Sequence, residues 1–211
     1  DLIVFPELTL TGYPPNDLLL RKGFVDEQLA YLDEVRKLTY DTETYILVGA
    51  VVKNDGVGKP LRNAAIGFAR GVEVFRYYKQ LLPTYNVFDE NRYFEPGSAE
   101  QDNRLTVMND ACTKVHTLGV LICEDCWNDE AITEAPLYDT NPILRAVKGK
   151  PNLFVTLNAS PSHVGKHRER YDMYSRLATK YNVPFLYVNQ VGGQDDLVFD
   201  GYSFYVNSKD A

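Results

Sequence analysis

Cysteine, long apolar runs and excess positive charge are all scarce in this sequence. Three cysteines among 211 residues argue against a disulfide framework and favour a reducing compartment, so we expect a cytoplasmic protein. No apolar run approaches the roughly 18 residues that a membrane span needs, so no membrane partner is expected. The formal charge of -7 argues against a nucleic-acid partner, whose binding surface would be basic.

Phosphate-binding and metal-binding motifs are also missing. Gly165-Lys166-His167 lacks the upstream glycine and the following Ser or Thr of a phosphate loop. His163 and His167 are four residues apart, but Gly165 between them weakens a helical metal-binding pair. We therefore expect no cofactor and no metal ion in this segment.

Short apolar runs that alternate with helical patterns predict an α/β fold. Strands are expected at Leu2–Phe5, Tyr45–Lys53, Leu61–Arg70, Val72–Tyr78, Arg104–Met108, Lys114–Ile122, Asn152–Leu157, Pro184–Asn189 and Val198–Val206. Apolar residues at helical spacing predict helices around residues 25–35 and 174–181, and a helical, polar stretch is expected at 128–148. Hairpins mixed with strand–helix–strand units predict one domain with mixed sheets and outer helices.

Three predicted strands each end at a residue with reactive chemistry. Glu7 follows the first strand and Pro6, Lys79 follows the strand that ends at Tyr78, and Cys123 follows Ile122. A thiol, a carboxylate and an ammonium are the groups that acyl transfer needs: a nucleophile, a base and an oxyanion stabiliser. Taken singly, each is more often a core, capping or surface residue, so the joint placement carries the hypothesis.

The two acids after Cys123 work against its reactivity. Glu124 and Asp125 should raise the pKa of the thiol and suppress the thiolate, whereas a nearby Lys79 would offset this effect. The long loop at residues 80–103 contains several aromatic residues, which favours an ordered and functional loop.

Other chemistries remain open at Cys123. Cys123 and Cys126 form a C-x-x-C pair that could be redox-active, or could join Cys112 and His116 in a zinc site of unusual spacing. A Cys–His hydrolase would need a histidine beside the thiol. His116 lies seven residues before Cys123, which on an alternating strand points it to the opposite face. Cys112 and Cys126 are expected to be packing residues.

Three segments carry a family resemblance. FPELTLTGYP (residues 5–14), YKQLLPTY (78–85) and ICEDCW (122–127) resemble the signature segments of the nitrilase (carbon–nitrogen hydrolase) superfamily. Within it, FDE (88–90), RYF (92–94), NASP (158–161) and Gly165-Lys166 resemble the glutaminase domain of glutamine-dependent NAD+ synthetases. The resemblance covers nearly the whole chain and implies a four-layer α-β-β-α sandwich.

The resemblance also implies roles for individual residues. Cys123 would be the nucleophile, Glu7 the general base and acid, and Lys79 the oxyanion stabiliser, with Glu90 as a second glutamate that positions substrate and lysine. The implied reaction is hydrolysis of the glutamine side-chain amide through a thioester.

The implied substrate-binding residues lie in loops. Tyr85, Ser160 and Lys166 match positions that bind glutamine, and Tyr13 and Glu124 are further candidates. Independently of the family, a glutamine pocket needs an acid for the ammonium group and a cation for the carboxylate. Glu124 and Lys166 suit these two ends.

The resemblance further implies that residues 1–211 are part of a longer chain. The family's first strand and a downstream synthetase domain, which would bind ATP and deamido-NAD+, are expected outside this segment, and a homo-oligomer is expected. One alternative is a stand-alone nitrilase-type amidase or carbamoylase that acts on another small amide. Another is a non-catalytic interaction domain, which the presence of all three reactive residues disfavours.

Overall fold

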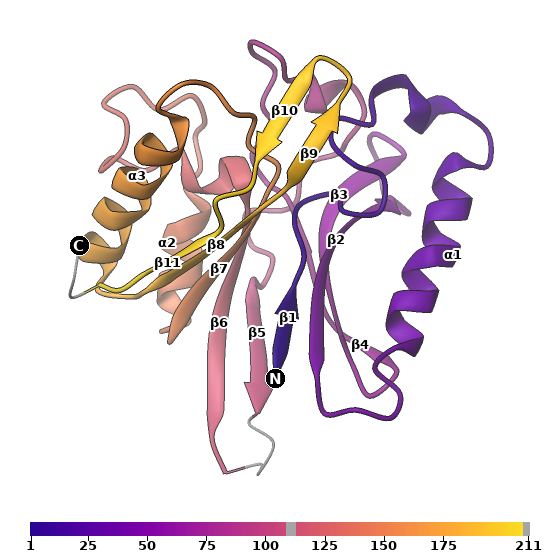
Figure 1. Ribbon diagram of the computed structural model, residues 1–211, viewed down its shortest axis with the longest axis horizontal. Helices are drawn as coiled ribbons and strands as arrows, with labels where there is room; N and C mark the ends of the chain where they lie inside the picture. The colour runs from indigo at the N-terminus through magenta and orange to yellow at the C-terminus, as the bar shows by residue number, and fades with distance from the viewer. Residues whose placement is uncertain (109–112, 209–211) are drawn as a thin grey trace.

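The computed structural model describes residues 1–108 and 113–208, in which two β-sheets pack face to face between outer helices (Figure 1). The first sheet has the order β1 (Leu2–Val4), β2 (Tyr45–Lys53), β3 (Leu61–Ala69), β4 (Val72–Tyr78), and α1 (Phe24–Lys37) covers it. The second has the order β11 (Phe204–Val206), β8 (Phe185–Asn189), β7 (Leu153–Asn158), β6 (Val115–Ile122), β5 (Arg104–Met108). The outer face of this second sheet is covered by α2 (Pro142–Lys148) and α3 (Lys166–Tyr181).

Both sheets are mixed, as predicted, and their packing between outer helices confirms the predicted α-β-β-α architecture. In the first sheet β1 runs parallel to β2, whereas β2, β3 and β4 are antiparallel. In the second sheet β6, β7 and β8 are parallel, and antiparallel strands β5 and β11 form its edges. The parallel strands bring their carboxyl ends to one edge of the sandwich, where such folds place their ligands.

Alternation along the strands builds a separate core on each face of a sheet. On β2, Ile46 and Val48 pack with Leu32 of α1, whereas Leu47 between them packs against the second sheet. Val120 and Ile122 of β6 belong to the same inter-sheet core as Leu47. Because side chains alternate in a strand, strands buried on both faces read as continuous apolar runs, which is how the sequence predicted them.

The β3–β4 hairpin confirms the predicted turn at Arg70-Gly71. Both residues have positive φ, at 49° and 75°. Two consecutive positive φ values fit the tight hairpin turn that matches the twist of the flanking strands.

The expected single strand Val198–Val206 is wrong. A hairpin of β9 (Val191–Gln194) and β10 (Leu197–Asp200) precedes β11 and lies across the upper ends of the two sheets in Figure 1. Gly201 and Tyr202 both have positive φ, which turns the chain out of β10 before β11 begins. Two of the four residues of β9 are glycines, so the composition carried no strand signal there.

Residues 1–108 and 113–208 contain three short 3-10 helices, one of which lies within the loop expected at residues 80–103. They are η1 (Asn16–Leu20), η2 (Glu90–Arg92) and η3 (Cys123–Cys126). The helical stretch expected at residues 128–148 is confirmed only for α2, and the rest is irregular. Among the described residues, no helix combines the length and apolarity that crossing a membrane requires.

Candidate active site

Glu7 is placed by a close approach between β2 and the loop after β1. The main-chain N–H of Gly49 donates to Pro6 O over 3.2 Å, and Gly49 O accepts from Thr9 N over 2.9 Å. A Cβ on Gly49 would lie 2.4 Å from Pro6 O and 2.7 Å from the Glu7 Cα. Only glycine permits this contact, which fixes the backbone of the completely buried Glu7.

Lys79 lies between two glutamates at the end of β4. Its Nζ is 2.7 Å from Glu7 Oε1 and 2.6 Å from Glu90 Oε1, and all three side chains are buried. The main chain of Lys79 is fixed as well, because its N–H donates to Asn63 O on β3 over 2.9 Å. The structure therefore brings three of the four predicted catalytic residues into direct contact.

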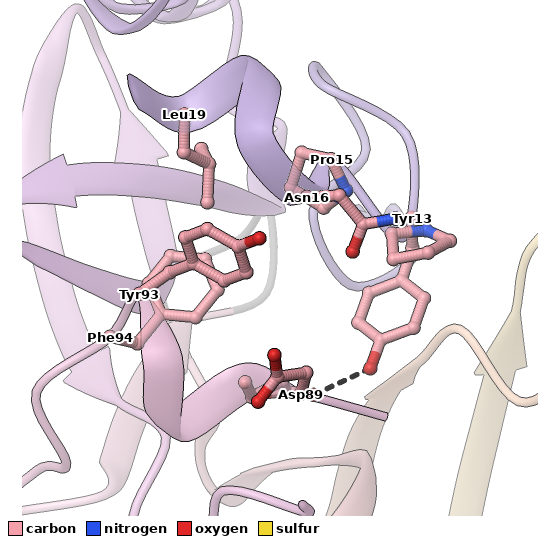
Figure 2. A pocket seen from close by; sticks show the side chains of 9 residues that line it. Tyr13, Pro15, Asn16, Leu19, Asp89, Tyr93 and Phe94 are labelled. Carbon is pink, nitrogen blue, oxygen red and sulfur yellow. Dashed lines mark hydrogen bonds between the residues drawn. The ribbon is translucent and has the colours of Figure 1, made fainter. Parts of the chain in front are cut away.

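Tyr13 contacts Glu90. Its hydroxyl donates a hydrogen bond to Glu90 Oε1 over 2.8 Å, drawn as the dashed line in Figure 2. Tyr13, Pro15, Asn16 and Asp89 surround a cavity of only about 10 Å³, room for roughly one water molecule. Tyr13 thus contacts the buried glutamate and lines this small cavity.

Glu7, Lys79 and Glu90 form a buried corner of the site, in which two carboxyl groups share one ammonium group. Burial raises the pKa of Glu90 to about 7, although Lys79 acts in the opposite direction. Burial alone would lower the pKa of Lys79, but the Glu7 and Glu90 carboxylates reverse the effect and hold this pKa above its ordinary value. Lys79 is therefore a permanent cation, and Glu90 can hold a proton near neutral pH.

Cys123 stands at the junction of β6 and η3 with a φ of 44°. A left-handed backbone at a non-glycine residue costs roughly 1–3 kcal/mol and persists only where the surroundings enforce it. The completely buried Asp125 supplies part of that enforcement. Its carboxylate accepts hydrogen bonds from Ile122 N (3.1 Å), Gln80 N (3.0 Å), Leu81 N (3.0 Å) and the Tyr77 hydroxyl (2.8 Å).

Asp125 therefore ties the turn that carries Cys123 to the chain immediately after Lys79. From the sequence, Asp125 was predicted only to raise the pKa of the thiol. In the structure its carboxylate is turned to the β4 side, and burial raises its own pKa to about 6. The signal in the sequence was an acid three residues after a buried strand, a type of residue that is rarely buried without partners.

The Cys123 thiol is neutral in the resting site. Burial raises its pKa, Glu7 and Glu124 raise it further, and Lys79 partly offsets them. This agrees with the expected opposition of acids and lysine. A neutral thiol needs a base as it attacks, and the Glu7 carboxylate acts on it electrostatically from the buried corner.

Cys123 opens into a cavity of about 330 Å³, within the range of roughly 300–1,000 Å³ for small-molecule sites. Its walls include the predicted residues Tyr85, Glu124, Ser160 and Lys166. Of the substrate-binding candidates, these four share the Cys123 cavity, whereas Tyr13 lines the small cavity beside Glu90.

Glu124 is the anionic wall of this cavity. Its carboxylate accepts hydrogen bonds from the Tyr85 hydroxyl at 2.9 Å and from the Tyr138 hydroxyl at 3.1 Å. Burial raises the pKa of Glu124. Tyr138 was missed from the sequence because it lies in the irregular stretch before α2, where no periodic pattern marks it.

Lys166 and Ser160 also line this cavity. Lys166 Nζ lies 4.6 Å from the centroid of the Trp127 ring, and it begins α3 at the cavity rim. The buried Arg170 fixes the Ser160 loop, donating to Ser160 Oγ over 3.1 Å and to Ser160 O over 2.7 Å. The remaining guanidinium nitrogen, Nη1, donates to Asp200 Oδ1 of β10 over 2.7 Å.

The rival residues lie elsewhere. His116 is near the start of β6, paired with Val107, far along the strand from Cys123. Cys126 is a free, buried cysteine in the core between α2, α3 and the second sheet. Cys112, which the zinc hypothesis included, lies outside the described residues.

Comparison with known proteins places this geometry in a family. Residues 1–209 match the carbon-nitrogen hydrolase family model. The chain belongs to the carbon–nitrogen hydrolase family. A glutamine-dependent NAD(+) synthetase from Synechocystis sp. is 44% identical over 99% of this chain and 37% of its own length. The Thermotoga maritima protein of the same description is 40% identical over 99% of this chain and 32% of its own length.

Solved structures agree with this family assignment. A glutamine-dependent NAD+ synthetase from Acinetobacter baumannii, in complex with adenosine diphosphate, superposes with a TM-score of 0.79 at 35% identity, covering 99% of this chain and 35% of that one. A nitrilase-superfamily amidase from Nesterenkonia superposes with a TM-score of 0.73 at 19% identity, covering 98% of this chain and 70% of that one. The second likeness concerns the fold. This hydrolase-family chain spans about a third of the length of its synthetase relatives.

Proposed function

We propose that this chain is the glutamine-hydrolysing domain of a glutamine-dependent NAD+ synthetase. The observation that carries the proposal is the single cavity in which Cys123 faces an acid, Glu124, and a cation, Lys166. A free amino-acid amide presents an ammonium and a carboxylate beyond its reacting end, and these two side chains are complementary to them. The synthetase relatives, which align over nearly the whole chain, support the same substrate.

The buried corner accounts for the chemistry. The Cys123 sulfur attacks the side-chain amide carbon while its proton passes to Glu7, and Lys79 stabilises the oxyanion. Glu7 then protonates the departing nitrogen, which leaves as ammonia, and a thioester remains on Cys123. Glu7 next takes a proton from water, which attacks the thioester and releases glutamate. Glu90 holds Lys79 in place from the other side.

The ammonia has a further use in the proposed whole protein. A synthetase domain outside residues 1–211 would use ATP to amidate deamido-NAD+ with it. Residues 1–211 themselves need no cofactor for the hydrolysis, because the nucleophile, the base and the cation are side chains. A free nucleophilic thiol also suits the reducing cytoplasm.

The test uses the full-length protein and two cysteine variants. Cys123→Ala should abolish glutamine-driven NAD+ synthesis and leave ammonia-driven synthesis unchanged, because the thiol serves only to release ammonia. Cys126→Ala is the matched control, since Cys126 is also free and buried but lies in the core behind the site. It should keep both activities.

The outcomes separate the proposal from its rivals. Equal loss of both activities in a folded Cys123→Ala protein would contradict the assignment. Hydrolysis of uncharged amides such as butanamide in preference to glutamine would favour a stand-alone amidase or carbamoylase. No hydrolysis of any amide by the full-length wild type would favour an inert interaction domain.

A further inference from the structure

A buried asparagine connects the two glutamates of the catalytic corner. Asn63, in β3, is 1% exposed, and its Nδ2 lies 2.7 Å from Glu7 Oε1 and 3.5 Å from Glu90 Oε2. The orientation of this amide is determined by its neighbours, since the flipped amide would turn Oδ1 toward two carboxylate oxygens. As oriented, Oδ1 has no hydrogen-bond partner among the described residues. The chain thus retains a buried, unsatisfied oxygen so that the amide donors face the glutamates.

The hydrogen bonds of Glu7 leave one of its oxygens open. Oε1 accepts from Lys79 Nζ and from Asn63 Nδ2, both at 2.7 Å. Oε2 accepts only the main-chain N–H of Ala159, at 3.2 Å, among the contacts of the described residues. A carboxylate has about four acceptor positions, two on each oxygen. The unfilled position is therefore on Oε2.

We propose that Asn63 is a positioning residue which, with Lys79, saturates Glu7 Oε1 and so reserves Oε2 for the proton of the reaction. This inference rests on the proposed function. The thiol proton of Cys123 moves to Oε2 as the sulfur–carbon bond forms, and moves on to nitrogen as the carbon–nitrogen bond breaks. In the second half, a proton of water moves to Oε2 and then to the sulfur as the sulfur–carbon bond breaks.

A neutral amide suits this task better than a second cation. Asn63 can donate to Oε1 whether or not Oε2 carries a proton, so the carboxylate keeps its orientation through both states. A second cation at this position would favour the ionised form and weaken Glu7 as a base. Lys79 already supplies the single positive charge that the two buried glutamates share.

The first test compares two asparagine-to-leucine variants of the full-length protein. Asn63→Leu keeps the side-chain volume and removes the donor. Asn103→Leu is the matched control, because Asn103 is also 1% exposed but its Nδ2 has no partner among the described residues. We expect Asn63→Leu to lower kcat for glutamine about 100-fold with KM within about twofold of wild type. The control should keep wild-type kcat.

The second test adds a titratable group at the same place. Its neighbours at this corner are the carboxylates of Glu7 and Glu90, the Lys79 ammonium, the Tyr13 hydroxyl and the Cys123 thiol. In Asn63→Asp, a protonated side chain can donate to Glu7, whereas an ionised one repels it. Activity should therefore fall on the alkaline side of the profile, at pH values where the wild type is still active. A purely structural role would leave the shape of the profile unchanged.

The results separate this inference from the proposed function. Wild-type kcat in Asn63→Leu, or a wild-type pH profile in Asn63→Asp, would overturn the role of Asn63 while glutaminase activity stands. Full-length wild type that does not hydrolyse glutamine would overturn the proposed function itself. If the leucine variant does not fold, the aspartate profile decides alone.

Discussion

The buried corner and the cavity rim of the site are built on opposite principles. In the corner, Glu7, Lys79 and Glu90 are at most 4% exposed and bind one another. At the rim, Tyr85 is 38% exposed and the Lys166 side chain lies over an aromatic ring. The charges of the corner are thus paired in a buried site before substrate arrives. At the rim, Glu124 is held by two neutral hydroxyls and Lys166 pairs with the exposed Glu169 at 3.2 Å, so both charges can bind a substrate. Substitutions in the corner should change kcat, and those at the rim should change KM.

Removal of the shared cation should have the largest effect. Lys79→Met leaves two buried carboxylates without their counter-charge, so we expect the free energy of unfolding to fall by about 3–5 kcal/mol. Loss of the oxyanion partner should lower kcat for glutamine by about 10²–10³-fold. Urea unfolding and steady-state kinetics measure the two effects. Lys180→Met removes the partly exposed cation that pairs with the buried Asp129 near the C-terminal end of α3. It should leave kcat unchanged, and equal kcat for the two variants would contradict the account.

The raised pKa of Glu90 predicts a pH dependence of stability in the same corner. Glu90 keeps its proton up to a pKa of about 7 in the folded protein, against 4.5 when unfolded. Between these values the folded state binds the extra proton, so stability contributed by Glu90 is full below pH 4.5 and is lost as pH rises through 7. The free energy of unfolding should fall by roughly 3 kcal/mol between these two pH values.

Glu90→Gln provides the comparison for this pH effect. Glutamine is neutral throughout, so the variant should lack this fall. The pKa of Asp125 is also raised, to about 6, but Asp125 is present in both proteins, so its contribution cancels in the comparison. Denaturant unfolding from pH 4.5 to 7.5 measures the difference. Parallel curves for wild type and variant would show that Glu90 is not the titrating group.

Addition of a single methyl group at Gly49 tests how strongly kcat depends on the backbone position of Glu7. In Gly49→Ala the new Cβ would meet Pro6 O and push the Glu7 loop from β2. We expect kcat to drop about 100-fold, since a displacement of about 1 Å can have that cost. Gly193→Ala on β9 is the control, because the closest atom to its Cβ would be 3.7 Å away. Similar kcat values for both variants would mean that Gly49 does not position Glu7.

The rim should respond with a smaller and different change. Glu124→Gln removes the anionic wall of the cavity, so KM for glutamine should rise about tenfold or more while kcat changes little. An uncharged amide, butanamide, is the matched control substrate, because it has no ammonium group for Glu124 to bind. An equal rise in KM for both amides would indicate general damage to the cavity instead of a lost charge contact.

The same contrast explains what the sequence could predict. Glu7, Lys79 and Cys123 could be found because each follows a strand that apolar runs make visible, and strand ends meet at one edge. Asn63 and Asp125 could not, because their importance depends on contacts between elements far apart in the chain. Asn63 reads as one polar residue within an apolar strand, and only the structure shows which carboxylate it faces.

The rest of the fold shows the same limit. Strands with β-branched or alternating patterns were predicted within a residue or two. The β9–β10 hairpin was not, since its form depends on glycine geometry and on packing across the sheet ends. Gln194 of this hairpin donates to Pro14 O over 3.0 Å, a contact between residues 180 positions apart that no local pattern could reveal.

The central claim is that the Cys123 sulfur is the nucleophile of a glutamine-binding site. The most direct measurement is peptide mapping by mass spectrometry after full-length protein reacts with a glutamine-mimicking electrophile. The account predicts one adduct, on Cys123, that excess glutamine prevents. An adduct on Cys126, or labelling of Cys123 that glutamine does not slow, would contradict it.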